Sequence, residues 1–134
     1  MPEIPELEAI RSYFTGQIAG KSIASAEARI PFVFRTPAQE IRETLVGDTF
    51  GPVQRHGKFL DIDCGGTHLV FHLARAGWLR WSEAMPATVL RPGKSPIALR
   101  VRFDDGSGFD LTEAGTKKSL AAYVVNDPLA VPRI

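Results

Sequence analysis

The length and composition of the chain indicate one folded domain. It has 134 residues, 44% of them hydrophobic and 23% charged, which is enough apolar content for a core and excludes a disordered class. No apolar run approaches the ~18 residues of a membrane-spanning helix. Because Cys64 is the single cysteine of the sequence, an internal disulfide and a thiolate zinc cluster are excluded. The net charge of +1 is lower than that of most dedicated nucleic-acid-binding domains, so local charge clusters matter more than the sum.

The first predicted element is an amphipathic helix that begins at Pro5. Apolar residues recur at helical spacing, and proline suits the first turn of a helix. These residues are Leu7, Ile10, Phe14 and Ile18. Glu6 and Glu8 complement the helix dipole, and either Gly16 or Gly20 ends the helix. Such a helix would hold the N-terminus in place.

A strand and a second helix are expected next. Residues 22–30 mix β-compatible side chains, and Thr36 followed by Pro37 is typical of a helix start. Ile41 and Leu45 would form the apolar side of this helix, and Gly47 would close it.

The rest of the chain has the pattern of short strands. Short apolar or alternating runs cover residues 50–54, 59–63, 68–73, 79–81, 98–103, 108–111 and 121–125. Gly57, the Gly65-Gly66 pair and the Asp104-Asp105-Gly106 turn separate some of them, and the proline-rich residues 84–96 indicate a loop. We therefore expect an α+β domain: a mostly antiparallel β-sandwich flanked by two helices. Cys64 is expected to be a small buried hydrophobe.

The N-terminus carries the clearest chemical signal. If Met1 is removed, the secondary amine of Pro2 becomes the first atom of the chain. It can attack an electrophilic carbon and form a charged Schiff base, and an α-amino group titrates near pH ~8, so part of it is neutral at pH ~7. Glu3 and Glu6 lie beside it in the sequence. A purely structural interpretation also applies, because both carboxylates suit a helix N-terminus.

Basic residues cluster at several places. Arg55, His56 and Lys58 form one group around Gly57. Lys117 and Lys118 form another pair. Each such group, taken alone, is typical of a solvated face.

Three motifs together resemble a known family. They are Pro2-Glu3-Ile4-Pro5-Glu6, Arg55-His56-Gly57-Lys58-Phe59-Leu60 and His72-Leu73-Ala74-Arg75-Ala76-Gly77. In combination they resemble the N-terminal domain of the formamidopyrimidine-DNA glycosylase/endonuclease VIII family, which excises oxidised bases from DNA. The resemblance covers essentially the whole chain, and the fold that it implies is the β-sandwich expected above.

The resemblance implies a role for each site residue. Pro2 would attack C1′ of the damaged nucleoside, and Glu3 would act as acid and base on the opening sugar. Glu6 would position water or the start of the helix, while Lys58, as a point charge on a strand, and His72 would bind phosphates. His72 could equally be a satisfied core histidine, and Lys58 a charge that protects a strand edge.

The chain departs from the family pattern at two segments. Typical members carry Gly-Met-Ser where this chain has Ala74-Arg75-Ala76, so Arg75 would replace the methionine that fills the gap in the DNA. Residues 111–118 replace a turn that normally contributes Arg and Phe to that gap. Lys117 and Lys118 can still contact phosphate. These departures predict a divergent member of the family.

The resemblance also sets expectations for organisation and partners. Residues 1–125 would be the catalytic-type domain, and residues 126–134 a linker toward a missing C-terminal DNA-binding region, which in the family usually holds a zinc finger. We expect damaged double-stranded DNA as partner, no membrane, a monomer, and no cofactor in this chain. The acidic start contrasts with a basic and apolar leader and favours a bacterial cytoplasmic protein, at the nucleoid when on DNA. The fragment alone is expected to have little or no activity.

Two other functions compete with the glycosylase. A binding module could keep the sandwich and recognise DNA or a protein without catalysis, which the changes at Arg75 and at residues 113–118 favour. Tautomerases also use an amino-terminal proline, as a general base. Their proline begins a strand in a much smaller chain, whereas Pro2 precedes a predicted helix.

Overall fold

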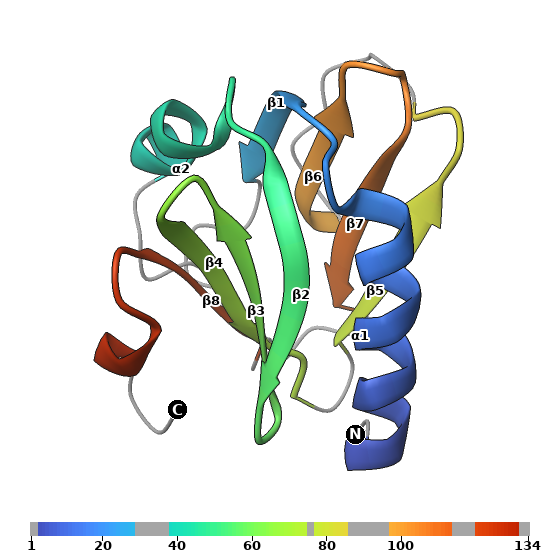
Figure 1. Cartoon of the computed structure of the whole chain (residues 1–134), viewed down its shortest axis with the longest axis vertical. Coiled ribbons are helices and arrows are strands. Elements are labelled where there is room, and N and C mark those ends of the chain that lie inside the picture. Colours follow the sequence, from blue (N-terminus) through green and yellow to red (C-terminus); the bar gives the residue numbers. More distant parts are fainter. Residues whose placement is uncertain (1–2, 29–37, 75–76, 86–96, 114–119, 132–134) are drawn as a thin grey trace.

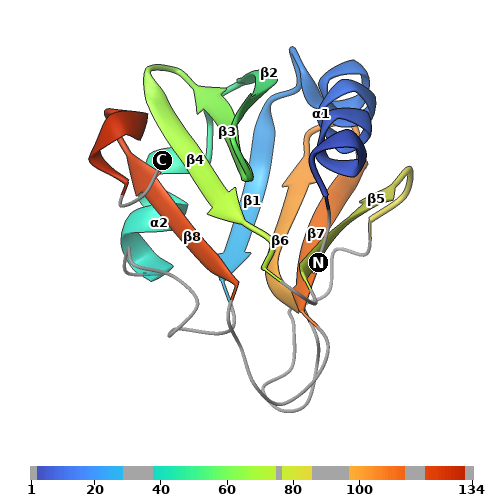
Figure 2. The same cartoon turned by 90° about the horizontal axis from the view of Figure 1, so that it is seen from below.

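The computed structural model describes residues 3–28, 38–74, 77–85, 97–113 and 120–131. It contains two four-stranded antiparallel sheets that pack face to face (Figures 1 and 2). One sheet has the order β1-β6-β7-β5 and the other β2-β3-β4-β8. The strands are β1 (Ile23–Ala28), β2 (Phe50–His56), β3 (Phe59–Cys64), β4 (Thr67–His72), β5 (Gly77–Ser82), β6 (Ile97–Phe103), β7 (Gly108–Glu113) and β8 (Ala121–Val125). The expected α+β sandwich is confirmed.

Turn residues set the strand boundaries. Gly65 and Gly66 both have positive φ (60° and 91°) in the β3–β4 hairpin, a conformation that two-residue hairpins require and that glycine adopts without strain. Gly57 also has positive φ (60°) in the β2–β3 turn. The hairpin predicted at Gly65-Gly66 is therefore confirmed, and Gly57 separates two strands as expected.

The core lies between the two sheets. Phe50 on β2 contacts Phe103 and Phe109 on the opposite sheet, with ring centroids 5.8 and 6.1 Å apart, in the range of favourable aromatic pairs. Cys64 is fully buried in the same core. Burial raises the pKa of its thiol to about 12, with the nearby acids Asp48 and Asp63 adding to the effect. The thiol is therefore a packing group, as expected.

Helix α1 (Ile4–Ile18) covers the free edge of β2. It buries Leu7, Ile10, Phe14 and Ile18, the four residues that the sequence pattern selected. At this edge Thr15 makes the hydrogen bonds that a neighbouring strand would otherwise make. Its hydroxyl accepts a hydrogen bond from Val53 N–H (3.0 Å) and donates to Val53 O (3.3 Å). The helix ends before Gly20, whose φ is 85°, and runs through Gly16.

The second helix and the tail complete the domain. Helix α2 (Ala38–Leu45) packs against β1 and buries Ile41 and Leu45. The cap predicted at Thr36 and the loop residues 86–96 lie outside the described residues. The stretch predicted as a linker begins with a 3₁₀ turn, η1 (Pro128–Ala130), and Val131 behind it is buried. The boundary of the domain at residue 125 stays a prediction.

In the described parts of the chain, no helix is both long enough and apolar enough to cross a membrane.

Candidate nucleic-acid interface

The N-terminus of α1 carries the first group of site residues. The backbone N–H of Glu3 donates to Oε1 of Glu6 at 3.1 Å, so Glu6 supports the first turn as in a capping box. Pro5 in that turn loses no hydrogen bond, because the first N–H groups of a helix have no partner within it. The side chain of Glu3 remains 67% exposed and can meet a ligand. Pro2 lies outside the described residues.

Lys58 comes from a distant part of the chain to meet Glu3. Its Nζ lies 3.7 Å from Oε2 of Glu3. Lys58 was expected on a strand, but it belongs to the β2–β3 turn, directly after Gly57. The strand prediction is wrong because the positive φ of Gly57 reverses the chain one residue earlier. The turn lies at the end of the sheet, beside the N-terminus of α1 (Figure 1).

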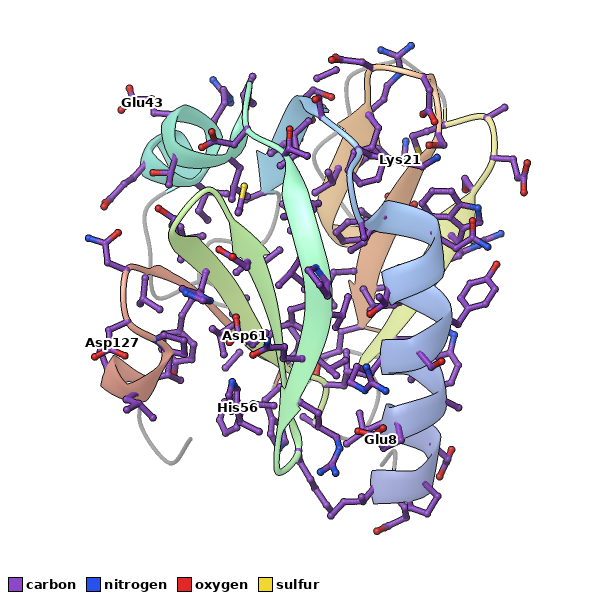
Figure 3. The ribbon with its side chains drawn as sticks, in the orientation of Figure 1. Glu8, Lys21, Glu43, His56, Asp61 and Asp127 are labelled. Atoms are coloured by element: carbon purple, nitrogen blue, oxygen red, sulfur yellow. The ribbon has the colours of Figure 1, made fainter. Side chains whose placement is uncertain are left out.

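The basic group around Gly57 is not a single cationic patch. Each of its side chains faces an acid: Arg55 faces Glu8, His56 faces Asp61 and Lys58 faces Glu3. The alternation of β2 sends Arg55 and His56 to opposite faces, so Glu8 and His56 lie on opposite sides of the strand (Figure 3).

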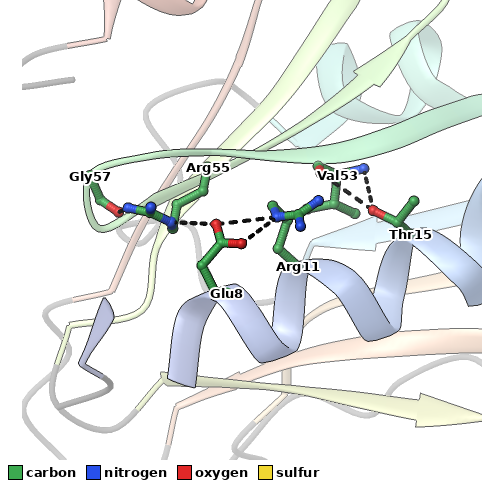
Figure 4. Close-up of polar contacts among 6 residues, drawn as sticks. All are labelled: Glu8, Arg11, Thr15, Val53, Arg55 and Gly57. Carbon is green, nitrogen blue, oxygen red and sulfur yellow. Dashed lines mark hydrogen bonds and ion pairs between the residues drawn. The ribbon is translucent and has the colours of Figure 1, made fainter. Parts of the chain in front are cut away.

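Arg55 and Glu8 connect the hairpin to the helix, as Figure 4 shows. Arg55 Nε donates to Oε1 of Glu8 at 2.7 Å, and Arg55 Nη1 donates to the carbonyl of Gly57 at 2.9 Å. Arg11 donates to the same carboxylate at 3.1 Å. Hydrogen bonds from Arg55 and then Arg11 lower the pKa of Glu8, so this carboxylate is ionised at neutral pH. Sequence reasoning gave Glu8 only a helix-dipole role and missed this contact.

The opposite face of the hairpin is held by a buried carboxylate. Asp61 on β3 is 2% exposed and accepts from His56 Nε2 at 2.9 Å and from His68 Nδ1 at 2.8 Å. A buried carboxylate needs such partners. The contacts join β2, β3 and β4 next to the Lys58 turn. Sequence reasoning missed this cluster, although a carboxylate between the apolar residues Leu60 and Ile62 of a strand is an available signal.

A backbone N–H two residues later in the chain positions the ring of His72 at the end of β4. Its Nδ1 accepts from the N–H of Ala74 at 3.0 Å, which leaves the proton of the neutral ring on Nε2. Burial, and then the charge of Lys58, lower its pKa, so the ring is neutral at pH ~7. The ring packs against Phe59 at 5.1 Å. His72 is therefore half-buried, with a donor that can serve a ligand.

The β4–β5 corner follows His72. Gly77 N–H donates to the Leu73 carbonyl at 2.9 Å, and Ala74 has a positive φ of 55°. A Cβ on Gly77 would lie 2.2 Å from that carbonyl oxygen, so only glycine fits. Arg75, inside this corner, lies outside the described residues.

The segment with Lys117 and Lys118 begins and ends beside the same corner. Glu113 pairs with Gly77 across β5 and β7, and Ala121 pairs with His72 across β4 and β8. The buried Glu113 also accepts from Leu120 N–H at 2.8 Å and joins the two ends. Lys117 and Lys118 themselves lie outside the described residues.

The site therefore gathers at one end of the molecule. The N-terminus of α1, the β2–β3 turn and the start of β5 lie together there in Figure 1. Beside them, a groove of about 540 Å³ runs between α1 and β5. Tyr13 and Trp78, about half exposed, line it, and Trp81 also lines it while it packs against the core.

The described residues hold no cluster of three or more His, Cys, Asp or Glu side chains that could bind a metal ion.

An exposed carboxylate, a lysine on a turn and a neutral histidine at one end of a β-sandwich define an arrangement suited to phosphates and sugar. The profile described as "Formamidopyrimidine-DNA glycosylase N-terminal domain" matches residues 1–119. The chain belongs to this family of DNA-repair glycosylases.

Individual relatives agree with this assignment. The formamidopyrimidine-DNA glycosylase of Salinispora arenicola is 31% identical over 96% of this chain and 49% of the relative. That of Pelobacter propionicus is 35% identical over 80% of this chain and 38% of its own length. This chain thus spans about half or less of the length of these relatives.

Solved structures show the same fold. The Lactococcus lactis enzyme, non-covalently bound to DNA containing an AP site, has a TM-score of 0.79 and 26% identity over 92% of this chain and 45% of its own. MutM in complex with DNA containing carbocyclic 8-oxo-G has a TM-score of 0.76 and 27% identity over 92% of this chain and 44% of its own.

Proposed function

We propose that this chain is the catalytic domain of a base-excision DNA glycosylase with AP lyase activity, which removes oxidised bases through a Schiff base on Pro2. The observation that carries the proposal is the approach of Lys58 to Glu3 at the N-terminus of α1. These two residues come from distant parts of the sequence, and one of them, Glu3, is covalently joined to Pro2. The relatives that share the fold are bound to damaged DNA in their structures.

The proposed reaction uses the chain's own groups. The Pro2 nitrogen forms a bond to C1′ as the glycosidic bond breaks. The base leaves with the bonding electrons and takes up one proton, which balances the proton that the nitrogen loses. Glu3 protonates the sugar-ring oxygen as the C1′–O4′ bond opens, which leaves a charged Schiff base. Abstraction of a C2′ proton then expels the 3′ phosphate. Acid–base assistance of this kind contributes about 10²–10⁴ in rate.

Lys58 and His72 would bind the phosphates that flank the lesion. Lys58 supplies a charge on a turn, and His72 supplies the Nε2 donor that its contact with Ala74 leaves available. Such contacts fix the register of the DNA without reading its sequence. Arg75, Lys117 and Lys118 are further proposed DNA contacts. The target nucleotide must leave the duplex for this chemistry.

Borohydride trapping tests the proposal. The chain, with removal of Met1 verified by intact mass, is incubated in large excess over abasic-site duplex at low salt. We expect a weak covalent product that Pro2→Gly, which replaces the secondary amine with a primary one, lowers strongly while binding to the duplex is kept. Absence of any Pro2-dependent product would overturn the proposal for this domain. Efficient cross-linking would instead contradict the expectation of low activity in the isolated chain.

A binding module without catalysis is the second candidate. The hydrogen bond between Glu3 N–H and Glu6 favours it, because helix capping accounts for Glu6 without any reaction. This candidate predicts that the chain binds abasic duplex but that Pro2→Gly and Glu3→Gln change neither binding nor cross-linking. The same trapping experiment, with an anisotropy measurement of affinity, therefore separates the two.

A further inference from the structure

We infer that Arg55 is a positioning residue, which holds the turn carrying Lys58 at a fixed place relative to the end of α1 that carries Glu3. The inference deepens the proposed function and rests on it. Arg55 itself need not touch DNA. It acts through Lys58, by fixing where the phosphate-binding ammonium group lies beside the acid at the reaction centre.

The two arms of the guanidinium group carry this inference. Nε reaches Glu8 on the helix at 2.7 Å, and Nη1 reaches the carbonyl of Gly57, directly before Lys58, at 2.9 Å. The guanidinium group is planar and rigid. It therefore holds the helix and the turn at a fixed separation, which the flexible side chain of a lysine with its single ammonium group cannot do.

The helix is joined to β2 at more than one place, and Arg55 makes the contact that reaches the backbone of the turn. Strand β2 is the edge of its sheet, and α1 covers that edge. Thr15 joins the helix to the middle of β2 at Val53, whereas Arg55 joins it close to the turn. Gly57, at the turn itself, has no side chain with which to anchor the chain.

A contribution to folding stability does not explain the contact between Arg55 and Glu8. The side chains of Arg55 and Glu8 are 25% and 42% exposed, and ion pairs of that exposure contribute little to folding. Glu8 also keeps Arg11 as a second partner at 3.1 Å. Loss of Arg55 would therefore leave Glu8 paired and the fold intact, while it releases the turn. Arg11 reaches the same carboxylate but is not bonded to the turn, so it is the matched control.

The first experiment measures single-turnover borohydride trapping against protein concentration for wild type, Arg55→Gln, Arg55→Lys and Arg11→Gln. Misplacement of reacting groups by about 1 Å can cost about 10²-fold in rate. We expect both Arg55 variants to lower the saturating rate about tenfold or more, with half-saturation changed less than about threefold. Arg11→Gln should stay within about twofold of wild type in both quantities, and thermal melts should show all variants folded.

The salt dependence of affinity separates positioning from direct contact. An arginine that binds phosphate would reduce the slope of log K against log[salt] by about one unit when removed. We expect the slope of Arg55→Gln to equal that of wild type. A reduced slope, a saturating rate equal to wild type, or full rescue by Arg55→Lys would each overturn the inference while the glycosylase proposal stands.

A second measurement needs no catalysis. Amide ¹⁵N relaxation of the free chain reports the order of the turn directly. We expect the heteronuclear NOE of Gly57 and Lys58 to fall in Arg55→Gln and to stay at the wild-type value in Arg11→Gln. Wild-type NOE values for Gly57 and Lys58 in Arg55→Gln would overturn the inference. If wild type gives no Pro2-dependent product, the proposed function fails, and the relaxation data still decide whether Arg55 orders the turn.

Discussion

His72 shows how one backbone hydrogen bond sets the chemistry of a side chain. The N–H of Ala74 occupies Nδ1 at 3.0 Å, so protonation of that nitrogen would break the contact. Burial and the positive charge of Lys58 act in the same direction and lower the pKa of the ring. The residue therefore serves the fold as a hydrogen-bond acceptor and the proposed site as a neutral donor.

The lowered pKa of His72 predicts a pH dependence of stability. The native chain resists protonation, whereas the unfolded chain takes up a proton near the ordinary value of about 6.5. The contribution of His72 is thus complete above pH ~6.5 and is lost as the pH falls toward the lowered native pKa. His72→Asn keeps an acceptor for Ala74 but does not titrate. In urea titrations between pH ~7.5 and ~5, wild type should lose stability relative to His72→Asn.

The comparison with His72→Asn removes every pH effect that the two proteins share. Parallel curves for wild type and His72→Asn across this pH range would contradict the assigned environment of His72.

At the scale of elements, the β4–β5 corner depends on Gly77. A Cβ there would lie 2.2 Å from the Leu73 carbonyl oxygen and 2.7 Å from Leu120 Cδ1. We expect Gly77→Ala to lower the free energy of unfolding by about 1–3 kcal/mol, because packed backbone must move. The corner joins His72 to the segment with Arg75, so DNA affinity should fall with it.

Gly16→Ala is the matched control, measured by the same urea unfolding. Gly16 is exposed on α1, and a Cβ there meets nothing within 4 Å. Alanine in a helix is favoured over glycine by about 0.5–1 kcal/mol, so this variant should be slightly more stable than wild type. Equal effects of the two substitutions would contradict the crowding at Gly77.

The element boundaries were largely accessible from the sequence, because glycine pairs and apolar spacing are local signals. The strand over 121–125 and the buried face of α1 are confirmed residue by residue. The prediction that Lys58 lies on a strand is wrong because a lone glycine does not show how many residues belong to the turn around it. The contacts of Arg55 with Glu8 and of Asp61 with His68 join residues far apart in the sequence or on different strands, so they depend on packing that a pattern does not encode.

At the scale of the molecule, charge pairing limits the attraction of the domain for DNA. The net charge is +1, and Arg55, His56 and Lys58 each face an acid. We expect weak binding to duplex DNA that falls steeply with salt, because each neutralised phosphate contributes a slope of about −0.9 in log K against log[salt]. Lys58→Met should reduce that slope by about one unit.

Lys21→Met provides the control for this titration. It removes the same charge, but Lys21 pairs with Asp105 at 2.6 Å near the opposite end of the molecule (Figure 3). The slope for Lys21→Met should match wild type. A slope that falls equally in both variants would show that only overall charge, and not the site at the N-terminus of α1, attracts the DNA.

The hydroxyl of Thr15 has a consequence beyond the reaction. An uncovered outer strand can recruit another chain and seed polymerisation, and the bonds from Thr15 to Val53 occupy both backbone groups at that position. The helix that carries Glu3, the proposed acid, thus also covers a strand edge that could otherwise pair with another chain. In the proposed function a single segment would serve both the repair chemistry and resistance to self-association, so selection on either one would constrain the other.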